Sequence, residues 1–266
     1  MAGRYPIVPD LVVDNKQMNI AGRTSFGESL PKGPGIYEMW LRVRIAIVIG
    51  SGAGPISEGE LNFIKSLYFK TDLGEICLDN VPGRGMFKVG LIKAETPPRK
   101  DAIAAATATY TVDIPIYFCD PDTQRPEDMI LDTSRYESMT FDITLGSIAD
   151  LFTAPGTATV TATGDLMIRR SKGRWNSAEA SPLGHVFYSV RNPVDAASVT
   201  EMKFELASDL SYKRAYIHSS TAGVAGQPWY GANSDAIIGA MTVKDGAGDW
   251  MRKVSYLQMQ DVNKAD

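Results

Sequence analysis

The sequence predicts an all-β protein, most economically two β-sandwiches or barrels in tandem. Short runs rich in β-branched and aromatic residues recur along the 266 residues, and clusters of Gly, Pro, Asn and Asp separate them. Amphipathic helical periodicity is almost absent, and the apolar fraction of 44% is that of a globular protein with a substantial core. Many short strands with frequent turn signals are typical of sandwich and barrel folds.

The chain is organised around the strand-like stretch 37–49, whose first half alternates. One face carries the apolar residues Met39, Leu41, Val43 and Ile45, and the other carries Glu38, Trp40, Arg42 and Arg44. This period of two predicts a strand with one buried face. From Ile45 to Ile49 every residue is apolar. We therefore expect a second sheet or a neighbouring subunit to cover that end of the strand on both faces.

Residues 1–36 are rich in Pro, Gly and Asn and predict an extended N-terminal arm that lies against the body or a neighbour. After the glycine-rich loop 50–55, the segments 61–70 and 75–78 flank a turn with Gly74, which predicts a hairpin. A helix over 58–70 remains an alternative, because Leu61, Ile64 and Leu67 also fit a helical period.

The rest of the chain continues the strand-and-turn pattern. Pro115 interrupts the long β-branched segment 102–119 and predicts an edge strand or a bulge there. Residues 147–152 predict a short helical turn. Further strand material lies at 86–92, 139–145, 157–163, 166–169, 186–190, 199–206, 214–218, 237–243 and 251–257.

Composition argues against several function classes. The formal net charge is −4 and no basic arm is present, so we expect no specific nucleic-acid binding. Cys77 and Cys119 fall in strand-like segments and predict buried free thiols. His185 and His218 are far apart, and no Gly-x-Ser-x-Gly motif places a nucleophile, so we expect no enzyme. Without an apolar leader or a long apolar run, we expect a soluble chain made in the cytoplasm.

The densest group of carboxylates is a candidate calcium site, because calcium takes six to eight oxygen ligands. Its candidate ligands are Asp120, Asp122, Glu127, Asp128 and Asp132. The alternative is a solvated turn in which these side chains cap the backbone beside Pro121 and Pro126.

Four aromatic residues are candidate contact anchors between subunits: Trp40, Trp175, Trp229 and Tyr230. Each could instead cover the end of its own barrel. The loop 227–230 also supports a different function, that of a carbohydrate-binding or receptor-binding β-sandwich whose Trp229 and Tyr230 stack on sugar rings.

Residues 40–81 and 108–145 resemble the first barrel of a viral jelly-roll major capsid protein. The resemblance rests on the long apolar strand that ends in glycines, on the segment 63–69 with its turn 71–74, and on the segments 112–118 and 134–143. In style and length the chain is similar to the small double jelly-roll coat proteins of icosahedral, membrane-containing bacteriophages, the corticovirus type within the tectivirus and adenovirus lineage.

This resemblance implies two tandem jelly-roll barrels, with one jelly roll plus an added β domain as the alternative. The first barrel would cover 37–172 and a second, shorter one 173–266, divided at the small, polar and basic segment 171–177. Because 173–266 is short for eight strands, the division could instead fall near residue 132.

The resemblance also implies a structural coat protein without an enzymatic activity or a required cofactor. Its copies would trimerise into pseudo-hexameric capsomers and close an icosahedral shell over an internal lipid membrane. Other virion proteins would be its further partners, bound calcium a stabiliser, and the virion its location after synthesis in the host cytoplasm.

Overall fold

The structure is a computed structural model that describes residues 7–50, 54–93, 97–119, 130–172, 188–189, 240–245 and 248–255. The chain divides into two compact units, residues 1–192 and 193–266. In the second unit, β11 (Ala240–Asp245) and β12 (Gly248–Ser255) pair antiparallel as a hairpin. All other described elements belong to the first unit.

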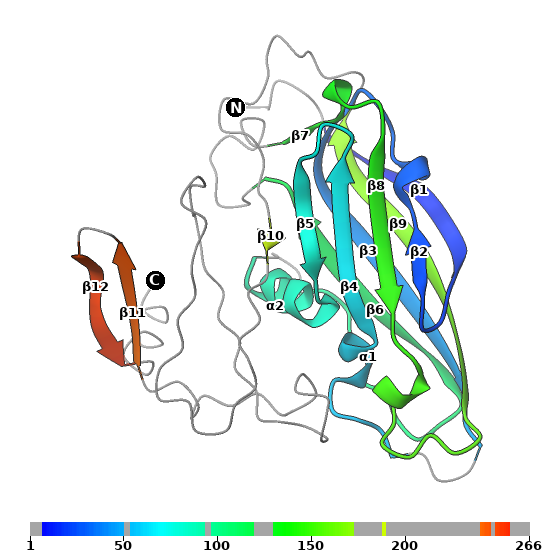
Figure 1. The fold of residues 1–266 in the computed structure, drawn as a ribbon. Helices are drawn as coiled ribbons and strands as arrows, with labels where there is room; N and C mark the ends of the chain where they lie inside the picture. Colours follow the sequence, from blue (N-terminus) through cyan, green and yellow to red (C-terminus); the bar gives the residue numbers. More distant parts are fainter. Residues whose placement is uncertain are drawn as a thin grey trace. The chain divides into compact units, whose positions relative to one another are not determined.

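Two sheets form the first unit (Figure 1). The sheet that we call the β3 sheet has the strand order β1 (Ile7–Met18), β9 (Thr159–Ser171), β3 (Gly35–Val48) and β6 (Ala108–Tyr117), with the short β7 (Leu131–Asp132) beside β3. The β4 sheet has the order β5 (Ile76–Val81), β4 (Ile64–Thr71), β8 (Met139–Leu145) and β2 (Arg23–Ser25). The short β10 (Tyr188–Ser189) extends the β4 sheet parallel to β5.

The order of these strands is that of a jelly roll. If the eight main strands are lettered B to I along the chain, the β3 sheet reads B-I-D-G and the β4 sheet reads F-E-H-C. This arrangement of two Greek keys in two packed sheets defines the jelly roll. The structure therefore confirms an all-β antiparallel fold and one jelly roll over residues 7–171. A second barrel over 173–266 and its boundary stay predictions, because most of that range lies outside the described residues.

The N-terminal segment differs from the expected extended arm. β1 pairs with β9 from Ile7 opposite Ser171 to Met18 opposite Ala162, and β2 pairs with β8. Residues 7–18 and 23–25 are therefore strands of the jelly roll itself. The register of β1 shifts twice, between Leu11 and Val13 and between Val13 and Lys16, and these irregularities interrupt the alternation that would have marked the strand in the sequence.

β3 has the buried and exposed faces that its alternation predicts. The end that is buried on both faces, however, is the N-terminal end and not the expected C-terminal end. Met39, Leu41 and Val43 are completely buried, whereas Trp40 on the opposite face is half-buried. Residues 35–39 are buried on both faces, and Val48 is 59% exposed. Among the described residues, nothing covers Val48, where β3 runs one residue past the last pair with β6, Ile47 opposite Ala108.

The space between the two sheets is filled by apolar and aromatic side chains. Four phenylalanine rings form a row of tilted contacts in this core. The ring centroids are 6.1 Å apart for Phe26 and Phe141, 6.0 Å for Phe141 and Phe69, and 5.6 Å for Phe69 and Phe118. Cys77 and Cys119 are buried free thiols, as predicted, and burial raises the pKa of Cys77. The inside of this jelly roll is therefore a packed core.

The helices close the sandwich at one side. α1 (Gly59–Asn62) precedes β4, so the segment 58–70 contains both the helical turn and the strand that the sequence left open. α2 (Gly83–Lys93) stands where strand material was expected, and it packs against β6 and β4 (Figure 1). Its buried stripe, Gly83, Met86, Phe87 and Gly90, has helical spacing. A Cβ at Gly83 would overlap Ile64 and one at Gly90 would overlap Pro115, so two glycines let α2 approach both sheets.

The η4 turn (Ile148–Asp150) confirms the short helical turn predicted there.

A cluster of charges fixes α2 to the start of α1. Glu58 adopts a left-handed backbone conformation (φ 54°) and forms ion pairs with Arg84 at 2.7 Å and with Lys88 at 2.8 Å. Lys100 lies 3.6 Å from Glu58 and 3.3 Å from Glu60. Burial alone would raise the pKa of Glu58, but the hydrogen bond from Lys88 and the charges of Arg84, Lys88 and Lys100 outweigh burial and lower it.

We expect Leu41→Ala to lower the free energy of unfolding by about 2–5 kcal/mol, because it leaves a cavity at the centre of the core. Urea denaturation of the full chain measures this change. Val48→Ala on the same strand is the matched control, with an expected loss below about 1 kcal/mol at an exposed strand position. Equal losses for both variants would contradict the assignment of the buried face.

Glu58→Gln should destabilise the protein by about 3 kcal/mol near neutral pH, because it leaves the buried Arg84 and the half-buried Lys88 without the carboxylate that pairs with them. Since the pKa of Glu58 is lowered in the folded state, the stabilisation by its ionised form is present above the ordinary value of 4.5 and is lost as the pH falls through the folded-state value. The difference between wild type and variant, measured by denaturation from pH 7 to about pH 3.5, should therefore shrink as the pH falls. Glu137→Gln, at an exposed side chain, is the control and should show no such narrowing.

Candidate interaction face

An apolar row crosses the outer face of the β3 sheet from β1 to β6. Met167 lies opposite Leu11 on β1 and opposite Trp40 on β3, and Trp40 lies opposite Pro115 on β6. Residues directly opposite one another in an antiparallel pair point to the same side of the sheet. Because Trp40 lies on the outer face of β3, the whole row lies there. Leu11 is 55% exposed and Met167 is 38% exposed, whereas Pro115 is buried beside α2.

Arginine–carboxylate pairs flank this row on both sides. On one side, the Nε and Nη2 atoms of Arg42 donate to Asp113 at 2.7 and 2.9 Å. Next to this pair, Arg44 binds Asp165 through both of its Nη atoms, with Nη1 at 2.8 Å from Oδ1.

On the other side of the row, Nη1 of Arg169 donates to Glu38 at 2.9 Å. The indole N–H of Trp40 donates to the same carboxylate oxygen at 3.0 Å. Trp40 therefore joins the apolar row to the flanking charges, and its ring is held by a side chain two residues away on its own strand.

In these three pairs the base lies outside and the acid lies beneath it. The side chains of Arg42, Arg44 and Arg169 are 42%, 34% and 53% exposed, and those of their acidic partners are each 10% exposed. Burial would raise the pKa of Asp165, but hydrogen bonds from Arg44 and from the backbone N–H of Asn15 lower it. The hydrogen bond to Asp113 raises the pKa of Arg42. The face thus presents paired guanidinium groups around an apolar centre, which we call the Trp40 face: Leu11, Met167, Trp40, Arg42, Arg44 and Arg169.

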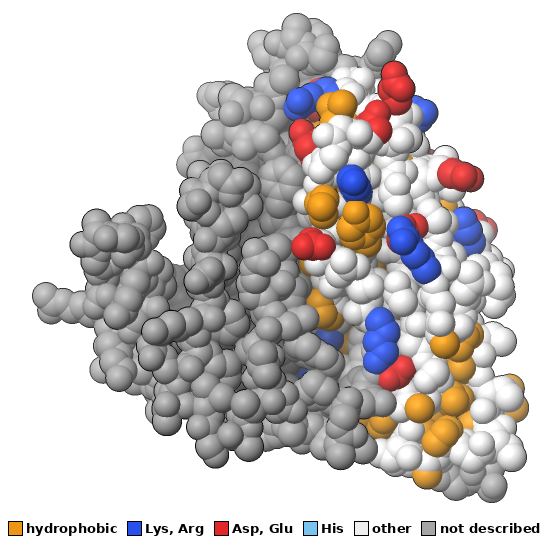
Figure 2. Space-filling model, in the orientation of Figure 1, with side chains coloured by type: hydrophobic (Ala, Val, Ile, Leu, Met, Phe, Trp, Pro, Cys, Tyr) orange, Lys and Arg blue, Asp and Glu red, His pale blue; other side chains and the backbone are white. Residues whose placement is uncertain are grey.

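The outer face of the β4 sheet also carries charged pairs (Figure 2). Arg23 pairs with Asp142 and lies over the ring of Tyr68, with its guanidinium carbon 5.7 Å from the ring centroid. Lys65 pairs with Asp150 at 2.6 Å. Charged and apolar side chains both lie on this surface in Figure 2.

Of the four predicted contact anchors, the structure places Trp40 on the outer face, as its alternation indicated. Trp175, Trp229 and Tyr230 lie outside the described residues. Leu11, Met167 and Arg169 are members of the face that sequence reasoning missed. Met167 and Arg169 do alternate with the buried Leu166 and Ile168. Their position beside Trp40, however, depends on the register of β9 against β3, which the local sequence does not determine.

Of the predicted calcium ligands, only Asp132 lies within the described residues, and Asp120, Asp122, Glu127 and Asp128 lie outside them. Oδ1 of Asp132 accepts hydrogen bonds from the backbone N–H and the hydroxyl of Ser134 at 3.0 and 2.6 Å, which caps the η3 turn (Thr133–Arg135). Its Oδ2 atom is buried and has no hydrogen-bond partner. The described part of the chain contains no group of three or more His, Cys, Asp or Glu residues that could hold a metal ion.

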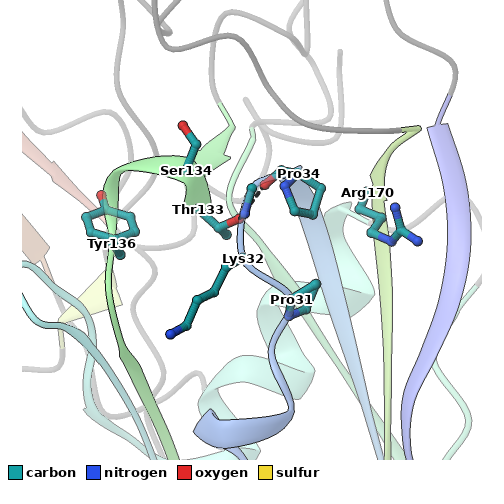
Figure 3. A pocket seen from close by; sticks show the side chains of 8 residues that line it. Pro31, Lys32, Pro34, Thr133, Ser134, Tyr136 and Arg170 are labelled. Carbon is teal, nitrogen blue, oxygen red and sulfur yellow. Dashed lines mark hydrogen bonds between the residues drawn. The ribbon is translucent and has the colours of Figure 1, made fainter.

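A pocket of about 570 Å³ lies next to Asp132, between residues 31–34 and 133–136 (Figure 3). Its hydroxyl groups bind within the protein: Thr133 donates to the Pro34 carbonyl at 2.5 Å, and Tyr136 donates to Glu75. Lys32 and Arg170 also line the pocket, but they extend in different directions in Figure 3. The two cations therefore do not converge on one ligand position.

No protein-family model matches the sequence, and no curated protein matches it significantly. Among solved structures, a chain in the atomic structure of Sulfolobus Turreted Icosahedral Virus is similar, with a TM-score of 0.48 and 12% identity over 65% of this chain and 47% of that one. The crystal structure of the STIV MCP is also similar, with a TM-score of 0.46 and 11% identity over 65% of this chain and 50% of that one. The chain thus spans about half the length of these neighbours. Neither neighbour is a corticovirus protein, so that finer assignment stays a prediction from the sequence. No helix in the described residues is long and apolar enough to cross a membrane.

Proposed function

We propose that this chain is a structural coat protein whose jelly roll associates with further copies of itself. The observation that carries the proposal is the combination of a jelly roll filled by its own side chains with an outer face that is partly apolar. Jelly rolls occur in viral capsids, in lectins and in cupins. Cupin chemistry takes place inside the barrel, but here aromatic rings from Phe26 to Phe118 fill that space.

The Trp40 face has the composition of a protein contact. The buried centres of protein interfaces are enriched in Trp, Met and Arg, and Trp and Arg are frequent among the residues that dominate binding. Because Arg42 and Arg44 already bind carboxylates, a partner that covers them does not bury an unpaired charge. Covering Leu11 and Met167 removes exposed apolar surface from water, which favours association.

The finer parts of the proposal follow from the sequence resemblance. Three copies would form a capsomer with pseudo-hexagonal outline, provided that residues 173–266 supply a second barrel to each copy. Capsomers of this kind would close an icosahedral shell over an internal membrane, in a virion with further proteins. The chain would then have no catalytic role, and its function would be to form the contacts between subunits that hold the shell together.

Calcium at Asp120, Asp122, Glu127, Asp128 and Asp132 remains part of the proposal. The buried Oδ2 of Asp132 supports it, since a buried carboxylate oxygen without a donor is suited to a cation. Bound calcium would neutralise this carboxylate and stabilise the neighbouring loop in the assembled state.

Multi-angle light scattering of the purified full chain tests the proposal. We expect a discrete multimer, trimeric in the simplest case, and a purely monomeric species at high protein concentration would contradict self-association.

The same measurement with a calcium chelator tests the metal. A lower mass after chelation, restored by added calcium, supports the calcium site, and an unchanged mass refutes a role for calcium in assembly. Asp132→Asn should reproduce the effect of the chelator, whereas Asp79→Asn, at an exposed position, should not.

A further inference from the structure

We propose that the Trp40 face binds the β4–β5 turn of a second copy of this chain, so that copies associate head to tail. This inference rests on the proposed self-association and adds the two surfaces that meet. A partner of the Trp40 face can use only the apolar side chains and the N–H groups that its internal ion pairs leave available.

The Trp40 face has hydrogen-bond donors to spare but few acceptors. Arg42 uses Nε and Nη2 for Asp113, which leaves its Nη1, and Arg169 uses Nη1 for Glu38, which leaves Nε and Nη2. The carboxylates that accept from them are mostly buried beneath the guanidinium groups. A complementary surface must therefore bring apolar side chains for Leu11, Met167 and Trp40, and carboxylate oxygens for the arginines.

The β4–β5 turn of the same chain has this composition. Leu73 is 59% exposed and Ile76 is 40% exposed, and they are among the large apolar side chains most exposed in the described residues. Asp72 and Glu75 stand beside them, so the tip 72–76 carries two carboxylates and no cation. Lys70, which lies opposite Ile76, is at the base of the turn, outside this tip.

The turn is held in a fixed shape. Gly74 adopts a positive φ of 87°, which only glycine accepts without strain, and its N–H donates to the Thr71 carbonyl at 3.1 Å. The carboxylate of Asp72 accepts from the backbone N–H of Glu137 at 2.9 Å, and Glu75 accepts from the hydroxyl of Tyr136. Because the acidic groups are already positioned, little conformational entropy would be lost when the turn binds.

The two surfaces cannot meet within one jelly roll. The turn joins two strands of the β4 sheet at the upper end of Figure 1, whereas the Trp40 face is the outer side of the β3 sheet, beyond the core. In Figure 2 several acidic side chains lie at this same upper end of the described part. A contact between two different surfaces is heterologous, and such contacts close into rings when the rotation between copies permits.

The open part of the face is large enough for most of a standard interface. Both faces of β6 are buried from Tyr110 to Tyr117, so the open part spans β1, β9 and β3, and three strands of 12 to 14 residues make a surface on the order of 600 Å². A standard interface buries roughly 800 Å² on each partner, so this contact is a smaller one. The turn would occupy the apolar centre of the face, and the flanks of the partner would cover the arginines.

Disulfide trapping in the full chain tests the contact. The double variant Leu73→Cys with Met167→Cys should, under mild oxidation, give covalent dimers and larger species on a non-reducing gel, at least fivefold above either single variant. The control is Leu73→Cys with Val48→Cys, because Val48 is as exposed as Leu73 but lies at the far end of β3 from Trp40. The natural thiols Cys77 and Cys119 are buried, and the single variants measure their background.

Each other result overturns the inference in a recognisable way. Cross-linking by Met167→Cys alone indicates a face-to-face contact, and a link within one monomer indicates that the turn reaches the face of its own chain. Equal cross-linking of the control pair indicates random collision. If light scattering shows a multimer but the Leu73 and Met167 variant does not cross-link, head-to-tail contact is refuted and self-association stands, whereas a monomer refutes both.

Discussion

The structure depends on β3, which is paired on both sides and buried along one face. β9 and β6 hydrogen-bond to its two edges over most of its 14 residues. Its inner face contributes four completely buried side chains to the core: Met39, Leu41, Val43 and Ile45. Since side chains alternate, fixing this face inward fixes Trp40, Arg42 and Arg44 outward. The core and the candidate interaction face are therefore two consequences of one register.

Buried acids organise the outer surface. Asp113, Asp165 and Glu38 would be unfavourable on a covered sheet by themselves, because a carboxylate that leaves water loses its hydration. Each is instead covered by an arginine, whose apolar stem lies over the sheet while its charged end reaches solvent. A similar arrangement recurs at the other sheet, where Arg23 covers Asp142 of β8 and Lys65 of β4 pairs with Asp150 of the η4 turn. In each of these pairs the positive side chain is the more exposed member.

The sequence allowed the fold class and most strands of the first unit to be predicted, because alternation and turn residues are local signals. The hairpin of β4 and β5, the strand β8 and the outward position of Trp40 are examples. The helix α2 was missed because its buried stripe contains Gly83 and Gly90, which reduce the apolar signal while permitting close packing. β1 was missed because two shifts in register break its alternation. The Trp40 face could be predicted only at Trp40, since Met167 reaches it by pairing with Trp40 and Leu11 reaches it by pairing with Met167, each across more than about 100 residues of chain.

The pairing of β1 with β9 also sets the order in which the molecule can be completed. These strands are separated by about 150 residues, yet they are neighbours in the β3 sheet, and β9 is in turn the strand that joins β1 to β3. During synthesis the ladder between β1 and β9 cannot be completed until residue 171 has been made. Loop closure over such a distance is slow compared with local hairpin formation. The ladder of β1 therefore forms late, and Pro9 and the register shifts of β1 are features that disfavour pairing with a wrong strand in that interval.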